Sequence, residues 1–309
     1  MKLQHQQIAY LYAMLAILAW STISTAFKLS LQQLSPVGLL FFASLTALLL
    51  LAVANLFSGS KKKQPYSRLL PSLGRNIVKS LPAGMLNPFV YYLVLFEAYS
   101  RLRAQEAQAL NYTWAIVLAL FSIWLLKERF RLMDLAALLL SFFGVLIIST
   151  KGRLDSLQFD DPIASFLAVF TSVVWALYWI ISLKDSRPAL QKLFYNFLVG
   201  FALIACFVTF GKISLFVPQA DIFRGVLGGI YVGIFEMGLT FLLWYKALEY
   251  SDNTAKISNL VFITPFLSLI FIAKVLGESI HPATFAGLGL IVFSNIVQKG
   301  GLGFLKRNT

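Results

Sequence analysis

Long apolar stretches alternate with short polar connectors along the whole chain. A helix needs about 20 mostly apolar residues to cross the roughly 30 Å hydrocarbon layer of a membrane. The longest connector, 58–76, carries Lys61, Lys62 and Lys63 and is predicted to be a basic loop. The pattern predicts an all-α integral membrane protein with ten transmembrane helices, at residues 8–28, 36–57, 77–99, 106–126, 132–150, 162–183, 193–211, 222–248, 254–275 and 281–298.

Composition supports a lipid-facing surface. Hydrophobic residues make up 59% of the 309 residues and charged residues 13%, whereas soluble domains carry about 25% charged residues. The net charge of +13 comes from lysines and arginines in the connectors, which argues against a nucleic-acid partner. Alternate connectors on the side of the termini carry about twice as many of these cations as the others, as is typical of cytoplasmic loops. We therefore expect a multi-pass protein of a bacterial cytoplasmic (inner) membrane, with both termini in the cytoplasm.

The chain contains an internal repeat. The sequence LAILAWSTIS around Trp20 is echoed by FTSVVWALYW around Trp175, and residues 96–130 are echoed by residues 245–280. We divide the chain into a first repeat, 1–150, and a second, 151–309, within one integral domain. Each repeat has five predicted spans, an odd number, so the second must cross the membrane in the opposite direction. Inverted repeats of this kind place a substrate site near the midplane and support alternating access, although duplication without transport stays open.

Glu236 is the sharpest candidate for a functional residue, because it lies near the centre of the apolar stretch 222–248. An ionisable side chain there costs at least about 2.5–3.5 kcal/mol if it faces lipid. Glu236 should therefore face protein or a watery cavity, where it could bind a cation, exchange a proton or make a structural hydrogen bond. In a regular helix, Thr240 and Trp244 would extend the same face.

Other candidates are polar or aromatic residues inside apolar stretches. Polar groups at membrane depth need partners, so the stripe formed by Gln105, Gln108 and Asn111 should face inward, for helix contacts or for a ligand. Trp20 and Trp175 occupy matched positions in the repeats and should form opposing walls of one cavity. The predicted substrate-binding set is Trp20, Tyr92, Asn111, Trp114, Trp175, Tyr178, Glu236 and Asn259.

Glycines and prolines form a second set of candidates, for packing or gating. Gly229 and Gly233 continue a four-residue spacing that lets a neighbouring helix approach closely, with hinging as the alternative. Pro88 and Pro265 interrupt their helices. We find no zinc-ligand cluster, nucleophile elbow or phosphate loop, so the sequence predicts neither an enzyme nor a metal site, and no cofactor beyond a coupled proton. The expected partners are a small-molecule substrate and the lipid bilayer, for a monomer or a homodimer.

With these features, the sequence resembles members of the drug/metabolite transporter superfamily, in its ten-helix EamA-type branch. The resemblance rests on ALNYTWAIVLALFSIWLLKERF (109–130) in the first repeat and WYKALEYSDNTAKISNLVFITPFLSLIFIAKVLGESI (244–280) in the second. It implies a basket of helices around a central cavity lined by spans 1, 3, 4, 6, 8 and 9. The stretch 111–114 is similar to one in members that export aromatic amino acids. Ala115 stands where a proline is common and Ser44 where an arginine is frequent, differences that bear on the substrate and not on the fold.

The sequence thus favours a secondary transporter that exports amino acids or related small metabolites by alternating access. A broad exporter of lipophilic cationic drugs is the alternative within transport, because an acidic, aromatic cavity also suits such cations. A receptor or assembly protein that does not transport is the alternative outside it.

Overall fold

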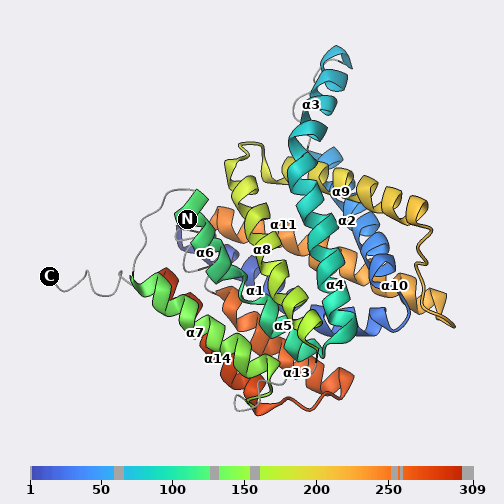
Figure 1. The fold of residues 1–309 in the computed structure, drawn as a ribbon. Coiled ribbons are helices and arrows are strands. Elements are labelled where there is room, and N and C mark those ends of the chain that lie inside the picture. The colour runs from blue at the N-terminus through green and yellow to red at the C-terminus, as the bar shows by residue number, and fades with distance from the viewer. Residues whose placement is uncertain are drawn as a thin grey trace.

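The computed structural model describes residues 2–58, 66–125, 132–153, 161–251, 257 and 260–300. In these residues the elements are helices, and the sheet-like pairing found is an isolated antiparallel bridge between Leu34 and Phe216. The first repeat holds α1 (Lys2–Leu31), α2 (Pro36–Ser58), α3 (Tyr66–Gly84), the π-helical η2 (Met85–Val90), α4 (Tyr91–Arg101), α5 (Ala104–Asn111), α6 (Trp114–Leu125) and α7 (Leu132–Ser149). The second holds α8 (Pro162–Lys184), α9 (Ala189–Gly211), α10 (Ile222–Val232), the π-helical η3 (Gly233–Gly238), α11 (Leu239–Tyr250), the 3-10 helix η4 (Val261–Ile263), α13 (Thr264–Leu276) and α14 (Pro282–Gly300) (Figure 1).

Several of these helices are long and apolar enough to cross a membrane. Among the described residues, five helices or continuous helical segments are long enough and contain a sufficiently apolar stretch of 18 residues, and shorter apolar helices lie within α7, η4–α13 and α14. Large apolar side chains point outward, as at Phe210, whose exposed fraction is 84%. Outward apolar surface of this kind marks a face that contacts a membrane or another protein, and on helices of membrane-spanning length it fits lipid. The prediction of an all-α membrane fold built from two repeats is confirmed.

One span in each repeat is interrupted at a matching place. The third span runs through α3, η2 and α4, and the eighth through α10, η3 and α11. A π-helical turn inserts one extra residue into a helix and often marks a functional site. In η2 the cause is Pro88, which has no amide hydrogen for the helical ladder. In η3 the hydroxyl of Thr240 donates to the carbonyl of Phe235 at 2.5 Å, which satisfies a backbone acceptor five residues back.

Each interruption packs against the second helix of the other repeat. A Cβ atom added to Gly200 of α9 would lie 2.4 Å from Cδ of Pro88 in η2. One added to Gly233 of η3 would lie 2.5 Å from the carbonyl oxygen of Ala43 in α2. The glycines therefore permit contacts that any larger residue would block, and the reciprocal pairing is what two inverted repeats produce.

The last helix of each repeat lies at the periphery. α7 and α14 run alongside each other at one edge of the bundle (Figure 1). A Cβ atom on Gly144 would meet the carbonyl of Gly287 at 2.6 Å, and the reverse distance is the same. α2 and α9 pack against η3 and η2 from outside, so the other six spans are left to surround the centre of the bundle.

The prediction of a basic loop over 58–76 is wrong for its second half. α3 begins at Tyr66 and continues without a break to Gly84. Basic residues recur in this helix between leucines, a spacing that forms an amphipathic helix as readily as a loop. Lys61, Lys62 and Lys63 lie outside the described residues.

Arg187 connects the turn between α8 and α9 to α3 through hydrogen bonds. Its guanidinium binds Asp185, with a shortest N–O distance of 2.6 Å, and also donates to the hydroxyl of Ser80 at 2.8 Å and the carbonyl of Asn76 at 3.1 Å. Partial burial alone would raise the pKa of Asp185, but the hydrogen bonds and charge of Arg187 outweigh it and hold that pKa below its usual range. The pair therefore stabilises the fold most when Asp185 is ionised.

Replacing Arg187 by glutamine should destabilise the fold by about 1–3 kcal/mol at pH 7, because it leaves charged and polar partners unpaired. The pKa of Asp185 is lowered on folding, so its contribution is complete above the unfolded value of about 3.9 and is lost as the pH falls through the folded value. We expect the difference in unfolding temperature between wild type and R187Q to shrink in acid.

The matched control is R224Q, because Arg224 and Asp221 pair with exposed fractions of 77% and 45% and such pairs contribute little. Equal losses in both variants would contradict the prediction.

Candidate functional site

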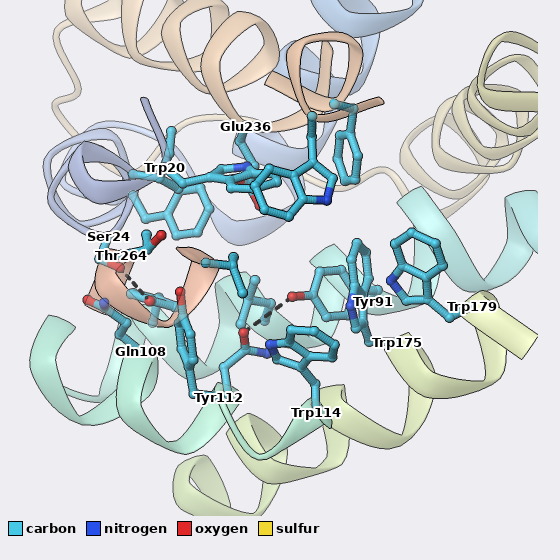
Figure 2. Close-up of a pocket in the computed structure, with 18 of the residues that line it drawn as sticks. Trp20, Ser24, Tyr91, Gln108, Tyr112, Trp114, Trp175, Trp179, Glu236 and Thr264 are labelled. Carbon is cyan, nitrogen blue, oxygen red and sulfur yellow. Dashed lines mark hydrogen bonds between the residues drawn. The ribbon is translucent and has the colours of Figure 1, made fainter. Parts of the chain in front are cut away.

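A cavity of about 330 Å³ lies inside the ring of six spans. Its size falls at the lower end of the roughly 300–1,000 Å³ typical of small-molecule sites. The walls come from α1, α4, α5, α6, α8, η3, α11, η4 and α13, so the six spans implied by the family resemblance do line it. The lining side chains are Trp20, Ile23, Ser24, Phe27, Tyr91, Leu95, Tyr99, Gln108, Asn111, Tyr112, Trp114, Leu118, Trp175, Trp179, Glu236, Phe241, Trp244, Leu248, Val261 and Thr264 (Figure 2).

Glu236 reaches this cavity from the π-helical segment η3. Its Oε1 accepts a hydrogen bond from the hydroxyl of Tyr92, at 3.0 Å. Tyr92 itself is fully buried and does not line the cavity, so it holds the carboxylate from behind. Among the described residues, no lysine, arginine or histidine forms an ion pair with Glu236. The carboxyl group of Glu236 therefore faces the cavity without a cationic partner from the described residues.

The expectation that Thr240 shares the face of Glu236 is wrong. Thr240 is fully buried and bonded to the backbone of η3. The extra residue in the π-helical turn rotates the following helix, so Phe241, five residues after Glu236, takes the place on the cavity wall. Trp244, the other residue expected on this face, does line the cavity.

Aromatic rings form most of the wall around Glu236. Trp20 contacts Trp244, with ring centroids 5.4 Å apart, and Phe241 at 6.1 Å. Trp175 contacts the same Phe241 at 6.1 Å and Tyr91 at 4.8 Å. The matched tryptophans of the two repeats thus both line the cavity, and Phe241 lies between them.

Asn111 is held in place by neighbours on two helices. The hydroxyl of Tyr91 donates to its Oδ1 at 3.4 Å, and its Nδ2 donates to the hydroxyl of Thr171 in α8 at 2.7 Å. Trp114 lines the cavity one turn further along the same span. Both predicted residues therefore lie at the cavity, with Asn111 oriented by two hydrogen bonds.

The other predicted binding residues that the structure describes lie away from the lining. Tyr178 is buried behind Trp175, 5.5 Å between centroids, and faces Asn87 and Asn196. Pro265 is buried in the first turn of α13, directly after the lining residue Thr264. Asn259 lies outside the described residues. Pro88, Gly229 and Gly233 make close helix contacts, in which a Cβ atom on Gly229 would meet Phe42 at 2.5 Å.

The predicted set omits one polar part of the cavity. Ser24, Gln108 and Thr264 line it from α1, α5 and α13, three helices that pack on one another. Ser24 follows Trp20 by four residues, so helical spacing alone could have identified it. Gln108 belongs to the polar stripe that also holds Asn111. Thr264 gives no signal of its own, because threonine is common in buried helices.

A group of hydrogen bonds joins the helices next to one end of the cavity, near the lining residues Phe27 and Gln108. The carboxylate of Glu278 accepts hydrogen bonds from the backbone amide of Ala104 at 3.0 Å and from the side chain of Gln105 at 3.3 Å. The other end of that Gln105 amide accepts from Thr284 at 2.9 Å. Lys28 donates to the last carbonyls of α4, at Tyr99 and Leu102, both at 2.9 Å.

A lined cavity enclosed by two inverted membrane repeats defines a class of protein, the membrane transporters. The chain belongs to the EamA-like transporter family, which it matches over residues 7–150 and again over 162–297. It is therefore a multi-pass membrane transporter and not an enzyme.

Several relatives align with nearly the whole chain. An uncharacterized transporter of Archaeoglobus fulgidus is 26% identical, over 92% of this chain and 93% of its own length. The aromatic amino acid exporter YddG of Escherichia coli (strain K12) is 26% identical, over 88% and 89%, and YddG of Salmonella typhimurium is 22% identical, over 94% and 96%. A crystal structure 23% identical to the chain superimposes with a TM-score of 0.62 and covers 97% of both chains, which shows the shared fold.

Proposed function

We propose that the protein exports amino acids with aromatic or large apolar side chains by alternating access. The observation that carries the proposal is the Glu236 carboxylate on the wall of an aromatic cavity. The relatives named aromatic amino acid exporters support the same substrate class.

Glu236 is suited to bind the ammonium group of an amino acid. A carboxylate in a cavity with a low dielectric constant interacts strongly with a cation that replaces its lost hydration. The tryptophans nearby add attraction through their ring faces, which are negative at the centre. When no substrate is bound, the same carboxyl can hold a proton, so substrate and proton would exchange at one site.

The charge pattern of the connectors supports a proposed orientation of the protein in the membrane. With both termini in the cytoplasm of a bacterial cell, Lys28 and Glu278 would lie at the outer end of the bundle, and an exporter would load its substrate from the end where α1 begins. All the lining residues come from one chain, so a monomer, or each subunit of a homodimer, would hold a complete site.

Lipophilic cations are the competing substrates, because an acidic residue among tryptophans also suits them. Counterflow in liposomes separates the two classes. Vesicles that contain the protein and are loaded with unlabelled L-phenylalanine should accumulate labelled L-phenylalanine, and vesicles without protein should not. Labelled tetraphenylphosphonium should not accumulate in vesicles loaded with the same unlabelled cation. Counterflow of the cation without counterflow of any amino acid would contradict the proposal.

A further inference from the structure

The cavity has two chemically different sides. In Figure 2, Ser24, Thr264 and Gln108 lie on one side, and Trp175 and Trp179 on the other, with Glu236 between them. One side therefore offers hydroxyl and amide groups next to the indole of Trp20, and the other offers the indole rings of Trp175 and Trp179 (Figure 2). This division matches the two parts of an aromatic amino acid, whose polar head group and ring lie at opposite ends.

Two side chains on the polar side have hydrogen-bonding capacity that the protein leaves unused. Gln108 is buried, with an exposed fraction of 6%, and its Oε1 has no hydrogen-bond partner. Thr264 is 4% exposed, and its hydroxyl faces the phenol of Tyr112 without a hydrogen bond of ordinary geometry. Buried polar groups are nearly always paired. Unused capacity at a cavity wall therefore points to a ligand that completes it.

Ser24 supplies a third polar group with an adaptable proton. Its Oγ lies 2.9 Å from the hydroxyl oxygen of Tyr99, and either atom could be the donor. If Tyr99 donates to Ser24, the Ser24 hydroxyl is free to donate into the cavity. Oε1 of Gln108 is an acceptor and would not bind a carboxylate, but a half-turn of the amide brings the Nε2 donors to its place. Because Oε1 has no hydrogen-bond partner, this rotation breaks no bond to it.

We propose that Ser24, Gln108 and Thr264 form a subsite for the carboxylate of the substrate. This inference rests on the proposed function, since it specifies how the amino acid lies: its ammonium on Glu236, its carboxylate on the polar side and its ring among the tryptophans. The protein's own Glu236 would repel a lone carboxylate. In a zwitterion, the ammonium lies next to the carboxylate and offsets this repulsion.

The subsite makes the protein selective for amino acids over the corresponding amines. An amine without a carboxylate would leave Gln108 and Thr264 buried and unpaired. Sites built to hydrogen-bond a substrate group reject analogues that lack it far more strongly than apolar pockets reject an extra group. A methyl ester keeps the ring and the ammonium but has no charged acceptor, so it should also bind weakly.

Competition against labelled tryptophan in the counterflow assay tests the subsite. With the wild type, tryptophan should compete at least about tenfold better than tryptamine or tryptophan methyl ester, the difference expected for loss of hydrogen bonds to a charged group. In the double variant Q108M/T264V, the inhibition constant of tryptophan should rise by about tenfold or more, while that of tryptamine stays within about twofold. The variant T264S, which keeps the hydroxyl, should keep the preference for tryptophan over tryptamine.

The matched control is S268A. Ser268 lies one turn further along α13, is fully buried and also has an unpartnered hydroxyl, but it does not line the cavity. It should leave both inhibition constants unchanged. Equal competition by tryptophan and tryptamine in the wild type would overturn the subsite, as would an equal rise of both constants in Q108M/T264V. If no amino acid undergoes counterflow at all, the proposed function fails, and the subsite fails with it.

Discussion

Replacing Glu236 by glutamine is expected to lower kcat/KM for phenylalanine export by at least about a hundredfold. Glutamine keeps the size of the side chain and can still accept the hydrogen bond from Tyr92, but it cannot pair with an ammonium or release a proton. Loss of one charge partner from a buried pair costs about 3–5 kcal/mol, and a hundredfold corresponds to about 2.7 kcal/mol. Initial rates in liposomes, with protein content and orientation measured in each preparation, give the comparison.

The matched control for E236Q is E249Q on the same span. Glu249 pairs with Lys246 at 2.7 Å, and its exposed fraction is 65%, so its charge is solvated, and Glu249 does not line the cavity. Export by E249Q should equal that of the wild type. Wild-type rates and unchanged pH dependence in E236Q would show that Glu236 only makes a structural hydrogen bond.

Replacing Gly233 by alanine should destabilise the protein by about 1–3 kcal/mol, the usual cost of overpacking. The added methyl group would lie 2.5 Å from the carbonyl oxygen of Ala43 and 2.6 Å from Cβ of Thr46. Neither atom belongs to the far end of a flexible side chain, so α2 and η3 would have to separate. Thermal unfolding in detergent measures the effect.

The same substitution at Gly289 provides the control. Gly289 lies within α14, and a Cβ atom there would meet nothing within 4 Å. G289A should therefore keep the wild-type unfolding temperature or raise it slightly, because alanine favours a helix over glycine by up to about 1 kcal/mol. Equal unfolding temperatures for G233A and G289A would contradict the close contact between η3 and α2.

Hydropathy and the internal repeat could predict the fold because a membrane constrains both the length of each span and the direction in which each repeat crosses it. Apolar length follows from bilayer thickness, and an odd number of spans per repeat requires inversion. The second half of the 58–76 connector was predicted incorrectly because its basic residues lower the hydropathy, although their spacing between leucines is also compatible with an amphipathic helix. Sequence length alone also could not show that the third and eighth spans are interrupted by π-helical turns.

The candidate site was predictable where residue type is unusual for its depth. An acid in an apolar stretch indicated Glu236, and matched positions indicated Trp20 and Trp175, all of which line the cavity. Thr240 was misplaced because the π-helical turn changes the helical phase after Glu236. Thr264 was missed because its proposed role depends on a hydroxyl group with unused hydrogen-bonding capacity at the cavity wall. That property depends on how α1, α5 and α13 pack together and cannot be read from the sequence.

Ammonium binding by Glu236 is tested most directly by competition between L-phenylalanine and N-acetyl-L-phenylalanine in the wild-type counterflow assay. Acetylation removes the positive charge and retains the ring and the carboxylate. Unlabelled phenylalanine should suppress uptake of the labelled amino acid, whereas the acetylated compound should require at least about a hundredfold higher concentration. Equal suppression by the two compounds would contradict an ammonium site at Glu236.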